Sequence, residues 1–443
     1  MDALLRVNII DGPFVGVVYT LALGAVVFIA VRRPTRRWII TGTSALLAGS
    51  VTAFVALWLV KLTNTFGVDL SVTTSIWVYL TFAAIGLAIV NLWKSRWPRK
   101  VVASVAIVLF TITGTVGINA DFGLDRTLAD LVGVSIEKPI VPPPPPPTPS
   151  PSLSLSPSRT PLAGGALWAN WIPPKDQPAA GTIGSVTIPN SLSGFRSRPA
   201  GLYLPPAALV KQPPLLPLVI MLMGQPGNPD PSFQKSILDA FASRHKGLAP
   251  IVLVADQLGN PAIDPLCLDT AKHGRSETFL VGDVVAWARA NLRVLPDAAH
   301  WTIAGYSNGG QCALSLGAKH PEIWGNVLDI SGEEYPGSAR PNQTLAESFA
   351  GDKAAYQAAK PVTILAGRRY SDTVGVFTVG SNDGRYVTQA KRVEAAAKSS
   401  GWKTTYFEVP NGGHVLGALN GGLEEGYRSL YPRLGLSDPA TTP

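Results

Sequence analysis

Trp301-Thr302-Ile303-Ala304-Gly305-Tyr306-Ser307-Asn308-Gly309-Gly310-Gln311-Cys312-Ala313-Leu314 is the stretch that decides the fold of this chain. The apolar run at 302–304 predicts a short buried strand, and the apolar residues at 312–316 predict a helix after it. Between them lies Gly-x-Ser-x-Gly, which is typical of a strained strand-to-helix turn with an exposed serine. Glycines flank the serine because a Cβ there would collide with neighbouring backbone. Ser307 is therefore a predicted nucleophile at a helix N-terminus, which favours developing negative charge.

Composition indicates a membrane protein. The chain has 443 residues, more than one ordinary domain needs, and 46% of them are hydrophobic while only 15% are charged. A net charge of +8 raises the question of a nucleic-acid partner. The basic residues, however, gather in short clusters beside apolar runs, a pattern that favours membrane topology and argues against nucleic acid.

The N-terminal quarter contains successive apolar runs, each close to the ~20 residues that an α-helix needs to cross a bilayer. They are Phe14–Val31, Ile39–Val60, Thr73–Trp93 and Val101–Ile118. A soluble helical bundle would carry polar faces, which these runs lack. A signal peptide would explain the first run only, and that run lacks a basic start and a small-residue cleavage site. The runs contain no acidic or basic residue, so we expect an anchor and no ion or substrate pathway.

The loops between the runs predict an orientation. Basic clusters at Arg32–Arg37 and Lys94–Lys100 join the first run to the second and the third to the fourth, and basic loops stay in the cytoplasm. Both ends of the four-helix module, and everything after about Asn119, are then extracytoplasmic. An undetected fifth crossing would reverse this orientation.

A proline- and serine-rich stretch, residues 142–161, follows the membrane module. Such a composition favours extended polyproline-like chain, a semi-rigid spacer that would hold the next domain off the membrane. We therefore expect a transmembrane module at 1–120, an extracytoplasmic linker at 121–163 and a globular domain at 164–443.

The globular part alternates predicted strands and helices, the pattern of a mainly parallel sheet covered on both faces. The predicted strands are 182–189 and 196–204, which open the domain as an antiparallel pair, then 215–223, 251–255, 302–304, 326–330, 374–379 and 404–409. The predicted helices are 235–244, 280–292, the one after Ser307, 387–399 and 423–430.

A serine nucleophile needs a base within hydrogen-bond reach and a carboxylate that orients the base. In the fold that carries this turn, the chain order is serine, acid, histidine. His414, in Gly412-Gly413-His414 just after the last predicted strand, is the candidate base. Weaker histidines precede the nucleophile or end its helix: His245, His273, His300 and His320.

The acid should follow the strand at 374–379, which makes Asp383 the candidate. An Asp-Gly pair also makes ordinary turns. Asp372, Glu333 and Glu334 remain competitors for the role.

Two backbone N–H groups should form an oxyanion hole. One belongs to Asn308, the residue after the nucleophile. The other comes from the loop after the strand at 215–223, where Pro226 has no N–H, so Gln225 is the predicted donor.

The two cysteines, Cys267 and Cys312, both lie outside the cell by the topology argument, where thiols are oxidised. One follows the strand at 251–255 and the other lies in the first turns of the helix after Ser307. We expect both at the carboxyl edge of neighbouring strands, close enough for a disulfide, with two separate buried thiols as the alternative. No Cys/His spacing indicates zinc, and no glycine motif indicates bound phosphate.

These motifs resemble the esterase D and mycolyltransferase branch of the α/β-hydrolases over residues 182–435. The resemblance is carried by the strand end 202–206, the turn 301–310, Asp383 and the loop at His414. The N-terminal anchor and proline-rich linker resemble those of actinobacterial membrane-bound esterases. Many hydrolases have His-Gly at the oxyanion loop, where this chain has Met223-Gly224.

The resemblance implies an α/β-hydrolase domain with serine esterase or acyl-transfer chemistry, without metal or other cofactor. We expect an esterase of the cell membrane that acts on envelope lipids or on aminoacyl or acyl lipids. A mycolyl-type acyltransferase that uses a glycolipid acceptor is one alternative. A hydrolase fold that only binds a ligand is another. The sequence identifies no protein partner.

Overall fold

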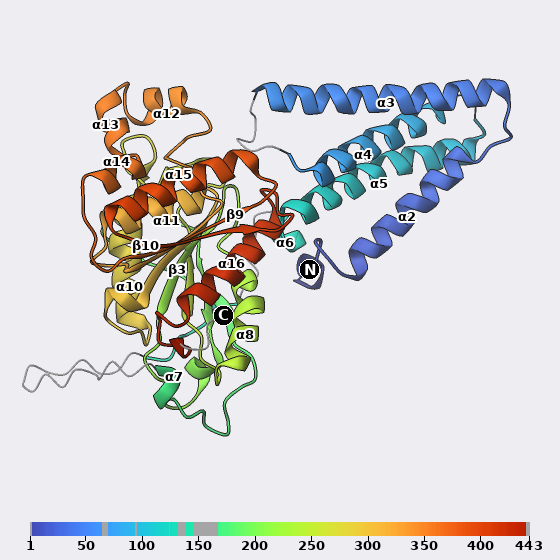
Figure 1. Cartoon of the computed structure of the whole chain (residues 1–443). Coiled ribbons are helices and arrows are strands. Elements are labelled where there is room, and N and C mark those ends of the chain that lie inside the picture. The colour runs from blue at the N-terminus through green and yellow to red at the C-terminus, as the bar shows by residue number, and fades with distance from the viewer. Residues whose placement is uncertain are drawn as a thin grey trace, which may run out of the picture. The chain divides into compact units, whose positions relative to one another are not determined.

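The computed structural model describes residues 2–63, 70–93, 95–123, 125–131, 138–144 and 167–439 (Figure 1). Contacts between residues divide the chain into two compact units. The first comprises residues 1–136 together with 414–416, and the second comprises 137–413 and 417–443. The predicted domain boundaries at 120 and 163 stay predictions, since most of the intervening stretch lies outside the described residues.

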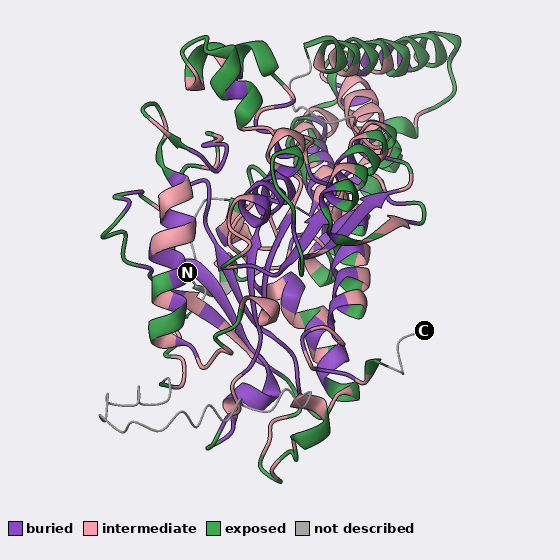
Figure 2. Cartoon of the chain, turned by 60° about the vertical axis from the view of Figure 1, so that its left-hand side comes forward, coloured by how far each residue is buried: buried purple, intermediate pink, exposed green. Residues whose placement is uncertain are grey.

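The first unit is helical. Its long helices are α2 (Pro13–Ala30), α3 (Arg36–Thr63), α4 (Val72–Val90) and α5 (Trp97–Phe122), with short helices α1 (Asp2–Leu5) and α6 (Leu128–Leu131). The four long helices coincide with the four predicted apolar runs, and each is long and apolar enough to cross a membrane. In each helix, at most 39% of the most apolar 18-residue stretch is buried in the protein. Figure 2 shows the same contrast, with long stretches of these helices exposed while the strands are mostly buried.

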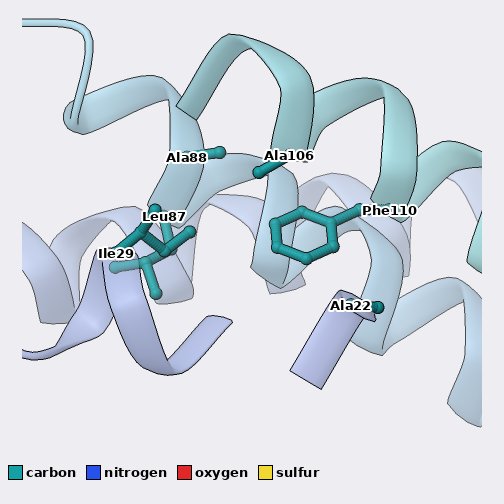
Figure 3. Close-up of a cluster of buried hydrophobic side chains, with 6 residues drawn as sticks. All are labelled: Ala22, Ile29, Leu87, Ala88, Ala106 and Phe110. Atoms are coloured by element: carbon teal, nitrogen blue, oxygen red, sulfur yellow. The ribbon is translucent and has the colours of Figure 1, made fainter. Parts of the chain in front are cut away.

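Small residues let these helices pack closely. A Cβ on Gly49 of α3 would lie 2.3 Å from the carbonyl oxygen of Phe82 on α4, so only glycine fits this approach. A small apolar cluster joins α2, α4 and α5 (Figure 3). Its buried members are Ala22, Ile29, Leu87, Ala88, Ala106 and Phe110.

The two basic loops lie at the same end of this bundle. Arg99, at the start of α5, donates to the carbonyl oxygens of Phe28 at 3.0 Å and Val31 at 3.2 Å, at the end of α2. Arg32 donates to Ser95, in the loop between α4 and α5. At the start of α4, Thr74 donates to Asp121, near the end of α5, at 2.7 Å. The basic clusters therefore share one end of the bundle, as the predicted topology requires.

The second unit is built on an eight-stranded sheet in the order β1-β2-β4-β3-β7-β8-β9-β10. The strands are β1 (Thr182–Val186), β2 (Ala200–Leu204), β3 (Leu218–Leu222), β4 (Ile251–Ala255), β7 (Trp301–Tyr306), β8 (Asn326–Ile330), β9 (Val374–Gly380) and β10 (Lys403–Val409). β2 is antiparallel to β1 and β4, and the remaining strands of this sheet, β4, β3, β7, β8, β9 and β10, are parallel to one another. The predicted mainly parallel sheet and its antiparallel opening pair are both present.

Helices cover the sheet. The longer ones are α8 (Ser232–Arg244), α11 (Asn308–Lys319), α15 (Gly384–Ser400) and α16 (Leu416–Leu430). α11 contacts β3, β7 and β8, and α15 contacts β9 and β10 (Figure 1). The predicted helix at 280–292 is a π-helical segment, η2 (Phe279–Val284), that continues into α10 (Val285–Asn291).

Shorter elements complete the second unit. They are α7 (Leu167–Asn170), η1 (Pro206–Leu209), the hairpin of β5 (Asp269–Thr270) and β6 (Gly274–Arg275), α9 (Ser276–Thr278), η3 (Ala298–His300), α12 (Pro341–Ser348), α13 (Lys353–Ala358) and α14 (Pro361–Ala366). The sequence analysis did not predict the three helices between β8 and β9.

The described residues on either side of the proline-rich stretch both belong to the second unit. Before it, the backbone N–H of Ile140 donates to the carbonyl oxygen of Ser185 in β1 at 3.1 Å. Gly184 makes room, since a Cβ on it would lie 2.7 Å from the Cβ of Ile140. After it, Trp168 in α7 donates its N–H to the carbonyl oxygen of Gly435 at 3.0 Å. Composition alone did not indicate that both flanks of this stretch are held by the same unit.

The predicted disulfide between Cys267 and Cys312 is present, with the Cα atoms 5.6 Å apart. Both side chains are almost completely buried. One expectation needs correction: the strands that precede the two cysteines, β4 and β7, are not neighbours, because β3 lies between them.

Removing this bridge should destabilise the second unit strongly. The closed loop spans 45 residues, for which the chain-entropy model gives a stabilisation of about 4 kcal/mol. We expect the Cys267→Ala/Cys312→Ala protein to unfold at a much lower urea concentration than the oxidised wild type. Peptide mapping without reductant checks the bridge itself. Two thiols that both react with an alkylating agent would contradict it.

Candidate active site

The turn at Ser307 has the strained geometry that its sequence predicts. Ser307 joins β7 to α11 with φ 56° and ψ −116°, a positive-φ conformation that is uncommon for a residue with a side chain. A Cβ on Gly305 would lie 1.9 Å from the carbonyl oxygen of Gly309, and a Cβ on Gly309 would lie 2.1 Å from that of Leu222. The glycines are therefore required on both sides. The Ser307 N–H donates to the carbonyl oxygen of Ile330 at 2.9 Å, which fixes the turn against β8.

The three predicted triad residues follow three parallel strands, so their loops lie at one edge of the sheet. Ser307 follows β7, Asp383 follows β9 and His414 follows β10. Asp383 is 5% exposed and His414 is 7% exposed. The loops after β9 and β10 are bonded together, because the Asn382 N–H donates to the carbonyl oxygen of Gly412 at 2.7 Å. The sheet thus brings the loops after β9 and β10 side by side as far as Gly412, and the triad itself stays a prediction.

Two of the competing acids are poorly placed. Asp372 precedes β9, at the opposite edge of the sheet, and pairs with Arg433 at 2.8 Å. Glu334 pairs with the exposed Arg392 at 2.8 Å. Each carboxylate is already engaged by an arginine.

Glu333 is the competitor that lies next to the nucleophile. Its backbone N–H donates to the carbonyl oxygen of Ser307 at 3.3 Å. Burial, followed by the nearby charge of Asp264, raises the pKa of Glu333 to about 7. A carboxyl with a pKa of about 7 is about half protonated at neutral pH, which makes it a weaker partner for a histidine that must become positively charged. Asp383 stays the predicted acid, with Glu333 as the remaining competitor.

The predicted oxyanion loop adjoins the nucleophile. A Cβ on Gly224 would lie 3.3 Å from the Cβ of Ser307. The carbonyl oxygen of Gly224 accepts the Gly227 N–H at 2.7 Å, which closes a tight turn. Because the peptide unit is planar, the N–H of Gln225 points away from that carbonyl and out of the turn. Asn308 is the first residue of α11. Gln225 and Asn308 stay the predicted donors.

Two side chains that the sequence analysis missed hold Asn308. Its Oδ1 accepts a hydrogen bond from Gln257 Nε2 at 3.3 Å, and its side chain also bonds to the carboxyl of Asp264. Gln257 and Asp264 follow β4 in a loop without a recognisable motif. Only the position of β4 in the sheet brings them to the turn, so no sequence signal could have identified them. Among the described residues, no group of His, Cys, Asp and Glu could hold a metal ion.

Asp329 lies in β8 behind the turn and should make stability depend on pH. Burial raises the pKa of Asp329 to about 7. The folded state therefore keeps a proton that the unfolded state releases above about pH 4. Stability from this group is present below that pH and is lost as pH rises through 7. Since asparagine cannot ionise, Asp329→Asn should gain on the order of 1–4 kcal/mol relative to wild type at pH 8, and much less at pH 4.

Urea unfolding of the detergent-solubilised protein at both pH values measures this change. The informative quantity is the difference in unfolding free energy between variant and wild type, because Glu333 also makes the stability of both proteins depend on pH. A difference that is the same at the two pH values would refute the assignment to Asp329.

Comparison with known proteins places this site in a family. The model of the putative esterase family matches residues 196–421, slightly more than half of the chain. The chain belongs to the putative esterase family. The match includes the Ser307 turn, Asp383, His414 and both cysteines of this putative esterase. Together with the mostly parallel sheet, it identifies an α/β-hydrolase-like fold.

Three individual proteins show how similar this chain is to others. An uncharacterised protein of Corynebacterium glutamicum is 35% identical over 238 residues, which are 52% of this putative esterase and 55% of that protein. The chain thus spans about half of the length of this curated relative. An S-formylglutathione hydrolase from Agrobacterium tumefaciens is similar in structure, with a TM-score of 0.49, 17% identity, and coverage of 58% of this chain and 97% of that one. A fluorophosphonate-binding serine hydrolase of Staphylococcus aureus has a TM-score of 0.45, 10% identity, and coverage of 58% and 99%.

Proposed function

We propose that this protein is a membrane-anchored serine esterase that hydrolyses ester bonds of envelope lipids, or of aminoacyl or acyl lipids, outside the cytoplasm. The observation that carries the proposal is the strained Ser307 turn at the carboxyl edge of the sheet, within a chain of the esterase family. The loops with Asp383 and His414 follow strands that end at the same edge.

The proposed reaction has two stages. Ser307 Oγ attacks the ester carbonyl while His414 takes its proton, and Asp383 orients the imidazole. The N–H groups of Asn308 and Gln225 stabilise the negative oxygen of the tetrahedral intermediate. The intermediate collapses, the C–O bond to the alcohol breaks, and His414 gives its proton to the departing alkoxide. Water then attacks the acyl-enzyme in the same way and releases the acid and free Ser307.

The proposed location rests on the first unit. Four apolar helices give an even number of crossings, and the two basic loops lie at one end of the bundle. With those loops in the cytoplasm, both chain termini and the catalytic domain lie outside. Protease added to intact cells should then cleave the second unit. A second unit that is digested only after the membrane is lysed would refute the outer location and with it the envelope substrate.

Lipid analysis tests the substrate class. A strain that carries Ser307→Ala should accumulate the lipid ester that its parent removes, and purified wild-type protein in vesicles should convert that lipid to free alcohol and acid. If the acyl group instead appeared on an added glycolipid, the protein would be a transferase of the mycolyl type. An unchanged lipid profile, with no conversion in vesicles, would contradict the proposal.

A further inference from the structure

The two predicted oxyanion donors belong to segments far apart in the sequence, and one buried side chain joins these segments. Gln257 follows β4 and is 2% exposed. Its Nε2 donates to the carbonyl oxygen of Met223 at 2.5 Å and to Asn308 Oδ1 at 3.3 Å. Met223 begins the loop that carries Gln225, and Asn308 follows the nucleophile.

The two hydrogen bonds of Gln257 Nε2 require an amide side chain at this position. The Met223 carbonyl can only accept a hydrogen bond, and Asn308 Oδ1 is an acceptor too, so the group between them must supply two donors. The –NH₂ of glutamine has two, whereas an ionised glutamate of the same shape has none. Ser276 Oγ, which is buried, donates to the backbone carbonyl oxygen of Gln257 at 3.0 Å and fixes the base of the side chain.

Asp256, the residue before Gln257, helps to hold the other end of the loop that carries Gln225. Asp256 forms an ion pair with Arg198 at 2.7 Å. Arg198 in turn donates to the carbonyl oxygen of Gly227 at 2.9 Å and to Asn228 Oδ1 at 2.6 Å. Consecutive residues after β4 therefore fix the start and the end of the oxyanion loop.

We propose that Gln257 is a positioning residue of the oxyanion hole, which fixes the loop at Met223 relative to Asn308. This inference rests on the proposed esterase function. With the Met223 carbonyl held, the planar peptides that follow set the direction of the Gln225 N–H. The donors must be aimed at the place where negative charge develops, so a small displacement weakens transition-state binding more than substrate binding.

The test compares full-length Gln257→Met and Gln257→Glu with wild type on a soluble chromogenic ester. We expect kcat to fall by roughly 10–100-fold with KM nearly unchanged, and the loss to be larger for glutamate, because loss of one oxyanion donor costs about 100–1,000-fold. The affinity for a trifluoromethyl ketone, which forms a tetrahedral adduct, should fall by the same factor as kcat/KM.

Gln234→Met is the matched control. Gln234 is a fully buried glutamine of α8 that accepts a hydrogen bond from Tyr427, in α16. Its loss should lower stability and leave kcat unchanged. If Gln257→Met changed kcat no more than Gln234→Met, or changed KM alone, the positioning role would be refuted while the esterase function stood. A wild-type protein that neither hydrolyses esters nor binds the ketone would overturn both proposals.

Discussion

Ser307→Ala is expected to lower ester hydrolysis by a factor on the order of 10⁴–10⁶ while the protein stays folded. Without Oγ no acyl-enzyme can form, and only the oxyanion donors and substrate binding remain to assist water. Alanine has the same backbone strain as serine at φ 56°, so thermal unfolding should be nearly unchanged. Initial rates with a short-chain chromogenic ester, together with a melting curve, measure both effects.

Ser315→Ala is the matched control for this variant. Ser315 is a buried serine of the same helix, and its Oγ accepts a hydrogen bond from Gln311 at 2.7 Å. It should cost some stability and leave turnover intact. Undiminished hydrolysis by Ser307→Ala would remove Ser307 from the mechanism.

Asp383→Asn is expected to lower kcat by about 10⁴-fold, because an amide stabilises the wrong tautomer of the histidine and cannot balance its positive charge. Glu333→Gln should have a smaller effect, since the raised pKa of Glu333, about 7, already leaves about half of its carboxyl neutral at pH 7. Purified variants assayed at several pH values make the comparison.

The reverse order of effects would change the assignment. If Glu333→Gln removed activity and Asp383→Asn did not, the acid of the triad would follow β8 and not β9. Equal and small effects of both would leave His414 without an orienting carboxylate and contradict the proposed triad.

Sequence alone predicts the Ser307 turn well because its constraints leave a recognisable five-residue pattern. Gly305 is required by the backbone of Gly309 in the same turn, and Gly309 is required by the backbone of Leu222 in the neighbouring strand β3. The buried strands are equally clear, since a continuous apolar run such as 251–255 becomes β4 without a change of bounds. Loops after such strands can then be assigned to one edge of the sheet.

Long-range packing explains what sequence could not show. Helix α16 begins at Leu416, seven residues before its predicted start, although Gly417, Gly421 and Gly422 disfavour a helix. Two of these glycines are needed for packing: a Cβ on Gly421 would lie 2.5 Å from Val409, and one on Gly422 2.5 Å from Thr378. Sequence could not identify Gln257 for the same reason, because its role depends on the order of strands in the sheet.

Reaction with a fluorophosphonate tests the central claim most directly. The probe forms a covalent bond only with a serine that is activated as a nucleophile. The full-length wild-type protein should gain one adduct, and peptide mass spectrometry should locate it on Ser307, with no labelling of Ser307→Ala. An unlabelled wild type, or an adduct on any other residue, would contradict the account.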